Sequence, residues 1–275
     1  MEATHVPPMG AAVRLTPTGR TATNLLASEW TKIRSVRSTY WTLIAAAATT
    51  IGLSAIICAV FVAQYANLTA QDKAGFEPAS ASLTGGILGQ FAIAVLGVLV
   101  ITGEYASGMI RTTLAAVPRR LTVLAAKVAV FGAFTLAATM TACFIAFFIG
   151  QAILSAKDIG VSIADPNALR TVVGTALYLT ILGLLSLGIG ALLRKTAGAI
   201  STVVAILFVL PVLASFLPSS LEAIQKYLPS NAGQVIIGGS GGANTLTPWV
   251  GLGVFGLYAV AVLGAAAFTL VHRDA

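Results

Sequence analysis

The chain has 275 residues, of which 57% are hydrophobic and 9% are charged, and its formal net charge is +7. Soluble domains usually carry about 25% charged residues, so this composition excludes an ordinary soluble globular protein. Uncharged stretches of about 20 residues recur along the chain, and about 20 apolar residues form a helix that crosses the ~30 Å hydrocarbon core of a membrane. The composition therefore predicts an all-α polytopic membrane protein.

The N-terminal region divides into a tail and a helix. Residues 1–23 are rich in Pro, Thr, Gly and Ala and predict a flexible cytoplasmic tail. Residues 24–37 predict a helix, although Glu29 falls at the edge of its apolar face. Trp30 suits a membrane interface, and basic side chains can reach lipid phosphates there. The apolar face comprises Leu26, Trp30, Ile33 and Val36, and the basic residues are Lys32, Arg34 and Arg37. We expect an interfacial helix.

Six membrane spans are predicted, at about 40–63, 81–103, 123–153, 171–193, 197–217 and 248–271, and residues 272–275 form a second cytoplasmic tail. Pro211 lies inside the fifth span, where a proline frees backbone groups and can kink the helix. The 30 or so residues between the last two spans are many for a structureless loop. Within them, residues 219–240 hold apolar pieces too short to span, so we expect a re-entrant or interfacial pair of short helices on the outer face.

The segment from Gly103 to Arg120 places several charges between two long apolar runs. Ser107 is a candidate N-cap for a short helix, and Pro118 is expected to end it. The apolar side of this helix would comprise Met109, Ile110, Leu114 and Val117, and the charges around it are Glu104, Arg111, Arg119 and Arg120. A short amphipathic helix followed by two arginines is typical of a docking element.

The distribution of Lys and Arg predicts the orientation, because cytoplasmic loops carry an excess of both. With a cytoplasmic N-terminus, the six spans leave only Lys73, Lys157, Arg170 and Lys226 outside and the other twelve basic residues inside. Both termini are then cytoplasmic. The positive net charge records this topology and a weaker attraction to anionic lipid, so nucleic acid is not an expected partner.

Four residues in or beside the spans allow two interpretations each. Lys127, the only charged residue within a predicted span, either contacts a substrate or extends to the headgroups, which we favour. Glu104 either pairs with Arg111, Arg119 or Arg120 or contacts a cytoplasmic subunit. Gln90 either lines a polar pathway or, more simply, forms a hydrogen bond between helices, as does Gln151.

The sequence holds no recognisable catalytic set. It lacks G-x-x-x-x-G-K-[ST] and H-E-x-x-H, and His5 and His272 lie in terminal segments, where no Ser–His–Asp arrangement is plausible. Cys58 and Cys143 are isolated within apolar runs. We therefore expect no metal, no cofactor bound by this chain and no enzymatic activity of its own.

In combination, these features resemble the ABC-2 family of ABC exporter permeases, in particular small actinobacterial members. The resemblance rests on ASEWTKIRSVRSTYW (27–41), on GEYASGMIRTTLAAVPRR (103–120), on six spans with both ends inside, and on the apolar excursion before the last span. The second segment is similar to the family's Glu-x-x-Ser-Gly-x-hydrophobic-Arg-Thr…Pro-x-Arg element, with Met109 where the family often has Thr.

The resemblance implies a type V exporter fold in a bacterial cell membrane. Residues 24–37 would be the elbow helix, about 106–117 the coupling helix that sits in a groove of a separate ATPase, and 219–240 the external re-entrant helices. One partner would be that ATPase, present in two copies, which binds ATP and Mg. Another would be a second permease chain, identical or different, that meets this one through spans one and five. Membrane lipid would be the third. The implied ATPase-coupling residues are Glu104, Ser107, Ile110, Arg111, Leu114, Arg119 and Arg120, the elbow residues are Glu29, Trp30, Lys32, Arg34 and Arg37, and the possible pathway residues are Gln90, Lys127 and Pro211.

Export of an amphiphilic or apolar substrate, such as a drug, an antibiotic, a lipid or a peptide, is what the resemblance implies together with the apolar spans. Two other classes stay open. A non-transporting membrane anchor or assembly subunit would explain the scarcity of polar residues in the spans. A secondary transporter often has repeated halves and ionisable residues within the membrane, and the sequence shows neither a repeat nor an acidic pair.

Overall fold

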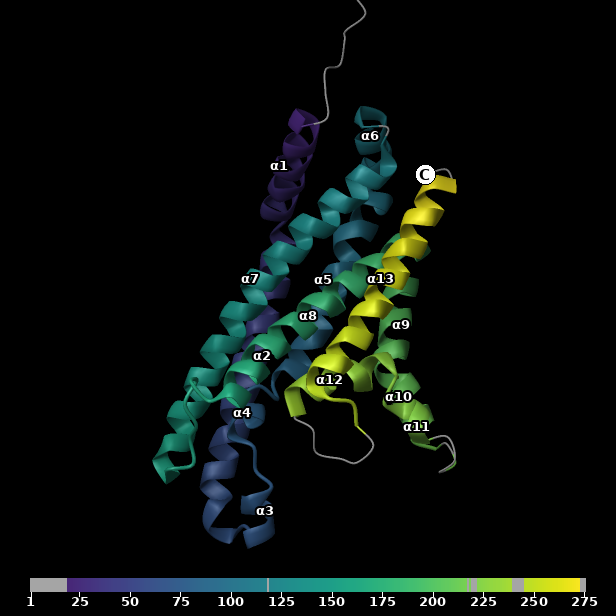
Figure 1. The fold of residues 1–275 in the computed structure, drawn as a ribbon. Coiled ribbons are helices and arrows are strands. Elements are labelled where there is room, and N and C mark those ends of the chain that lie inside the picture. Colours follow the sequence, from purple (N-terminus) through teal and green to yellow (C-terminus); the bar gives the residue numbers. More distant parts are fainter. Residues whose placement is uncertain (1–18, 118, 217, 219–221, 239–244, 273–275) are drawn as a thin grey trace, which may run out of the picture.

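The computed structural model describes residues 19–117, 119–216, 218, 222–238 and 245–272, and within them all regular structure is helical (Figure 1). The tails predicted at 1–23 and 272–275 fall mostly outside these residues, as do Pro118, 219–221 and 239–244. In this described part of the chain, six segments are long and apolar enough to cross a membrane, which confirms the predicted number. Their helices are α2 (Arg37–Gln64), α5 (Gly86–Ala106), α7 (Arg120–Leu154), α8 (Pro166–Leu193), α9 to α10 (Thr196–Ala214) and α13 (Pro248–His272).

Shorter helices connect and cap these six. They are α1 (Gly19–Ser35), η1 (Tyr65–Asn67), α3 (Ala70–Ala74), α4 (Pro78–Ala81), α6 (Met109–Ala116), η2 (Ser155–Lys157), α11 (Glu222–Gln225) and α12 (Pro229–Gly238). The second span begins later than predicted, because Ala81 ends the separate helix α4 and α5 begins at Gly86. The turn between them brings Gly85 so close to α2 that a Cβ atom there would lie 2.1 Å from the Thr50 carbonyl oxygen. A glycine is therefore required at this contact.

Helix α8 forms the centre of the bundle. Its side chains are buried on nearly all sides, whereas α2 and α13 expose much of their surface. Tyr178, Leu182 and Leu185 of α8 are among the most buried large residues of the described chain. Helix α5 reaches it through Gly97, where a Cβ atom would lie 2.2 Å from the carbonyl oxygen of Gly183. Close van der Waals packing around α8 is thus the main feature that holds the helices together.

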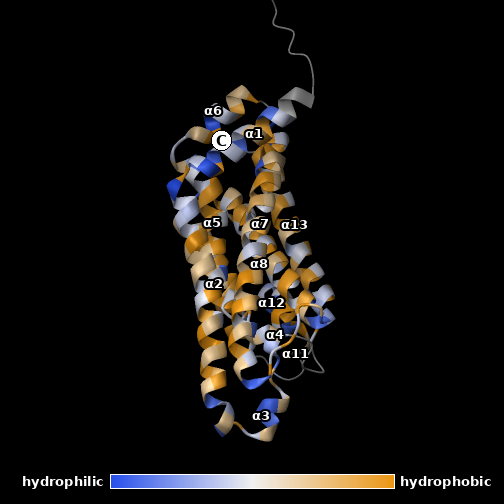
Figure 2. Ribbon diagram, turned by 90° about the vertical axis from the view of Figure 1, so that its left-hand side faces the viewer, coloured by the Kyte–Doolittle hydropathy of each residue, from blue (hydrophilic) through white to orange (hydrophobic). Residues whose placement is uncertain are grey.

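The two ends of the bundle differ in what they carry. Figure 1 shows α1, α6 and the end of α13 at one end, which we call the α6 end, and α3 and α11 at the other. Hydrophilic segments gather towards both ends and hydrophobic ones between them (Figure 2). At the α6 end, Arg120 Nη1 donates to the Leu270 carbonyl oxygen at 2.9 Å and joins the start of α7 to the end of α13. That the α6 end is cytoplasmic stays a prediction.

The fifth candidate span is irregular where it holds Pro211. A π-helical segment, η3 (Ala205–Val209), separates α9 (Thr196–Val204) from α10 (Leu210–Ala214). The Leu210 amide donates to the carbonyl oxygen of Ala205, five residues back. A proline interior to a helix lacks the amide proton and clashes with the carbonyl four residues earlier, so the wider turn gives it room. The helix ends at Ala214, earlier than the predicted limit of 217, a residue outside the described part.

The segment between the last two spans contains α11 and α12, so its described part has the two short helices predicted there. Helix α12 packs against α8 and α13. A Cβ atom at Gly233 would lie 2.5 Å from the ring of Tyr178, and one at Gly251 would lie 2.4 Å from the carbonyl oxygen of Ala232. These small residues let α12 fold back onto the bundle. Its depth in a membrane stays a prediction.

Candidate functional site

Helix α1 lies alongside the first turns of α7. Leu25 packs against Val123 and Ala126, and further along Trp30 meets Phe134 edge to face, with ring centroids 5.7 Å apart. The two helices therefore run in the same direction, with α1 upright beside the bundle (Figure 1). The bounds differ from the predicted 24–37, because α1 spans Gly19–Ser35, extended Val36 follows it, and Arg37 opens α2. Its position at a membrane interface stays a prediction.

Four side chains from α1, α5 and α7 form a buried ion cluster, which we call the charge cluster. It consists of Glu29, Lys32, Glu104 and Lys127. Lys127 Nζ lies 2.5 Å from Glu29 Oε2 and 2.7 Å from Glu104 Oε1. Lys32 Nζ lies 2.5 Å from Glu29 Oε1 and 3.1 Å from Glu104 Oε1. Glu29, Lys127 and Glu104 are only 1%, 2% and 4% exposed, so α1 is held to the bundle by charges removed from solvent.

The charge cluster corrects two predictions. Lys127 does not extend to the headgroups, because its ammonium group is enclosed by two carboxylates. Glu104 pairs with Lys32 and Lys127, which replaces the arginine pairing that was one of its two interpretations, and its contact with a cytoplasmic subunit stays a prediction. Two positive and two negative side chains leave the cluster formally neutral, which offsets much of the cost of taking each charge out of water.

The ion pairs of the cluster shift the pKa values of two side chains of α1, Glu29 and Lys32. Burial tends to raise the pKa of Glu29, but the charges of Lys127 and Lys32 and their hydrogen bonds outweigh it and hold the pKa below its ordinary value. Burial likewise tends to lower the pKa of Lys32, yet Glu29 and Glu104 raise it above its ordinary value. Both shifts favour the ionised forms, so the cluster is stabilised as ion pairs.

A cavity of about 350 Å³ adjoins the charge cluster. All four charged residues line it, together with Ser107, Met109 and apolar side chains of α5. Glu104 Oε2 is buried and has no hydrogen-bond partner within the described residues. In the same part of the chain, no group of three or more His, Cys, Asp or Glu side chains could hold a metal ion. The site therefore offers charge pairing beside a cavity that is lined largely by apolar side chains.

Helix α6 is attached through a left-handed glycine. Gly108 has φ 72° and is the N-cap of α6, a conformation that glycine adopts without strain. The predicted cap was wrong, because the Ser107 hydroxyl donates to the Gly103 carbonyl oxygen at the end of α5. The left-handed residue ends one helix and starts the next. It leaves α6 (within the 106–117 expected for a coupling helix) at the tip of the α5–α7 hairpin.

The apolar side of α6 faces its own bundle. Ile110 is buried, and Leu114 packs with Val117 against the small cluster that joins α1 to α7. Ile110 is therefore covered by its own chain and Leu114 only partly so, and the role of both in a partner contact stays a prediction. The outward surface instead presents Met109, Arg111, Thr112 and, just beyond the helix, Arg119.

A second buried polar group, the neutral network, lies deeper in the bundle. Tyr178 of α8 donates its hydroxyl to Gln90 Oε1 of α5 at 2.5 Å, and Gln234 Nε2 of α12 lies 3.5 Å from the same oxygen. Gln90 therefore bonds between helices, as favoured from sequence. Gln151 does so too, with Nε2 2.9 Å from Ser82 Oγ. The sequence analysis missed Tyr178 and Gln234. Both residues could have been found as polar side chains within otherwise apolar stretches of the sequence.

Comparison with known proteins adds no assignment: no protein-family model matches the chain, and no curated protein is similar to it.

Proposed function

We propose that the chain is the transmembrane permease subunit of an ABC-2-type exporter, acting with a separate ATPase subunit in two copies and with a second permease chain. The observation that carries the proposal is α6. It is a short helix whose apolar side is fixed to the bundle, while Met109, Arg111 and Arg119 face outward at the end of the α5–α7 hairpin. A fixed helix with an exposed basic rim suits a rigid contact with a cytoplasmic subunit.

The charge cluster supports a mechanical role for this contact. A load on α6 reaches the ends of α5 and α7 directly, and the pairs of Lys127 with Glu29 and Glu104 pass it to α1. Closure of two ATPase subunits would then move α1, α5 and α7 as one unit. Because buried ion pairs resist separation, movement by rotation of this unit is favoured over sliding within it.

The substrate class follows from the apolar spans and from the resemblance. A path lined by Ala, Leu, Val, Phe and Thr suits an amphiphilic or apolar cargo, and the family exports such compounds. Export is thus part of the proposal.

The test is a pull-down of the full tagged chain from its native membranes in a mild detergent, with ATPase activity assayed on the eluate. We expect a stoichiometric P-loop ATPase, and we expect R111E/R119E to lose it, because both arginines are exposed on or beside α6. Arg120 is left intact in this design, since it bonds to Leu270.

A matched control reverses a basic residue elsewhere at the same end. Lys195 is exposed in the turn after α8, next to Thr196, whose hydroxyl lies 2.9 Å from Thr102 Oγ1. K195E should keep the ATPase. Recovery of the chain alone or as a dimer without ATPase would contradict the proposal and favour an anchor.

One observation favours a second candidate, a secondary transporter. Glu29 and Glu104 form with Lys127 the buried ionisable group that the sequence did not reveal, and a cavity adjoins it. Such groups often mark ion pathways. Reconstitution in liposomes separates the candidates. Substrate movement driven by a pH gradient without ATP, and abolished by E104Q, would support the secondary transporter and contradict the permease.

A further inference from the structure

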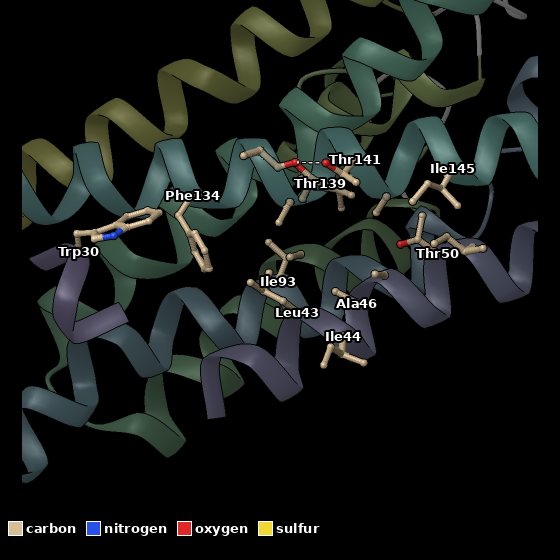
Figure 3. Close-up of a pocket in the computed structure, with 16 residues that line it drawn as sticks. Trp30, Leu43, Ile44, Ala46, Thr50, Ile93, Phe134, Thr139, Thr141 and Ile145 are labelled. Atoms are coloured by element: carbon tan, nitrogen blue, oxygen red, sulfur yellow. Dashed lines mark hydrogen bonds between the residues drawn. The ribbon is translucent and has the colours of Figure 1, made fainter. Parts of the chain in front are cut away.

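A groove of about 500 Å³ opens between α2 and α7. Figure 3 shows Trp30 and Phe134 at one end of it and Ile145 towards the other. Small side chains, among them Ala47 of α2 and Ala138 of α7, line its length and leave the space between the two helices. Its volume is within the range of roughly 300–1,000 Å³ typical of ligand sites. The groove is apolar and lies on two helices that expose much of their surface.

The depth of the groove matches one lipid leaflet. Arg37, Ile44 and Ile51 recur at seven-residue spacing on one face of α2, and both isoleucines line the groove. At 1.5 Å per residue, they lie about 10 Å and about 21 Å along the helix from Arg37. One leaflet of the bilayer, with its headgroup region, is about 20–22 Å thick. With the Arg37 guanidinium at the phosphates, the groove therefore lies at the depth of an acyl chain.

Two unpaired cations stand at the Trp30 end of the groove. Arg34 follows Trp30 by four residues and so shares its face of α1, and Arg37 opens α2. Both are exposed, and neither has a hydrogen-bond or ion-pair partner within the residues that the structure describes. Trp30 itself lines the groove, and a tryptophan ring suits the membrane interface.

We propose that this groove binds one phospholipid with an anionic headgroup, whose phosphate pairs with Arg34 and Arg37 and whose acyl chain lies between α2 and α7. An apolar slot of leaflet depth accounts for the chain, and the two arginines account for the charge. The bound lipid fills the space that alanines leave and stiffens the α1–α2–α7 contact. The inference requires the membrane spans and is independent of the transport role.

The experiment is native mass spectrometry of the full purified chain in detergent, titrated with phosphatidylglycerol or with phosphatidylcholine of the same acyl chains. We expect one phosphatidylglycerol per chain to be retained in preference to phosphatidylcholine. R34Q/R37Q should remove the preference, with about a fivefold loss of phosphatidylglycerol affinity for each arginine. A138F should lower the retention of both lipids, because its ring fills the slot. A47L is a smaller filling change should A138F not fold.

Matched variants control for charge and bulk. K157Q/K195Q removes two exposed cations elsewhere, and A265F adds a ring on the exposed face of α13, so neither should change lipid retention. Equal retention of the two lipids by the unmodified chain would overturn the headgroup assignment. Unchanged retention in A138F and A47L would overturn the acyl-chain assignment. A changed oligomeric state in A138F with lipid retention intact would assign the groove to a second copy of the chain and overturn the proposal.

Discussion

One face of α5 contributes to two buried polar groups, the neutral network and the charge cluster. Gln90, Gly97 and Glu104 follow one another at seven-residue spacing, so the neutral network and the charge cluster lie about 21 Å apart along the same helix. The neutral network joins α5 to α8 and α12, and the charge cluster joins α5 to α1 and α7. Gly97 lies between them, at the close contact with Gly183 of α8.

The difference between the two groups is in what happens when one member is lost. A neutral donor or acceptor that loses its partner leaves one hydrogen bond unmade. A buried charge that loses its partner leaves an ion in a medium of low polarity, which costs several times more. The charge cluster therefore specifies strictly which helices meet, and the neutral network does so weakly. Four experiments test this, from the largest expected effect to the smallest.

The largest effect is expected for K127M. The variant keeps the length of the side chain but leaves Glu29 and Glu104 with Lys32 alone, so the free energy of unfolding should fall by about 3–5 kcal/mol. Thermal unfolding in detergent measures it. The triple variant E29Q/E104Q/K127M removes the stranded charges and should regain most of the loss. A K127M variant as stable as the parent would mean that the cluster does not form.

The next effect concerns the contact between the two groups. G97A places a Cβ atom 2.2 Å from the Gly183 carbonyl oxygen, so α5 and α8 must separate, at a cost of about 1–3 kcal/mol. G103A lies six residues later on the same helix and meets nothing within 4 Å, so it should be neutral or stabilising. Melting temperatures of the pair decide the outcome, and equal values would refute the close approach.

The neutral network should be the weaker of the two polar groups. Y178F removes the hydroxyl that donates to Gln90 and leaves only the 3.5 Å contact with Gln234, so a loss of about 1 kcal/mol is expected. Y258F removes an exposed hydroxyl that bonds to the Tyr227 carbonyl oxygen and should change stability little. If Y178F were as damaging as K127M, the proposed ranking would be wrong.

The smallest effect is the response to pH. Glu29 has a lowered pKa, so its contribution is complete above the ordinary carboxyl value of 4.5 and is lost as the pH falls through its lower folded value. Lys32 has a raised pKa, so its contribution is complete below the ordinary value of 10.5 and is lost above it. Emission of Trp30, with Trp41 and Trp249 replaced by Phe, should therefore be constant from roughly pH 5 to pH 10. A transition near pH 7 would contradict the ion pairs.

The spans were predictable because crossing a membrane requires a continuous run of about 20 apolar residues, and such a run is visible in the sequence itself. The charge cluster was not, because Glu29 and Lys127 are 98 residues apart in the chain. A partial signal existed: Glu29 lay at the edge of an apolar face and Lys127 lay within an apolar span, and each charge needed a partner. Ser107 misled because the cap was assigned from residue type, whereas the left-handed Gly108 starts α6.

The sequence also could not predict which surface the apolar side of α6 contacts. Periodicity identified Ile110 and Leu114 as one apolar side, but it cannot tell whether that side meets the same chain or a partner. The packing of Leu25 of α1 on Val123 and Ala126 of α7 supplies the surface that Leu114 contacts. Only the parallel placement of α1 and α7 creates it.

The π-helical turn before Pro211 changes the rotational phase of the helix within the fifth span. A π turn accommodates one residue more than a regular turn, so every side chain after Val209 is rotated by about 100° from the position that α9 alone would give it. Removal of one residue from Ala205–Val209 would therefore rotate α10 by about 100° and bring different side chains against the bundle, without altering the composition of α10. In this span, the number of residues before α10 determines which of its side chains face the bundle, as much as the identity of those residues does.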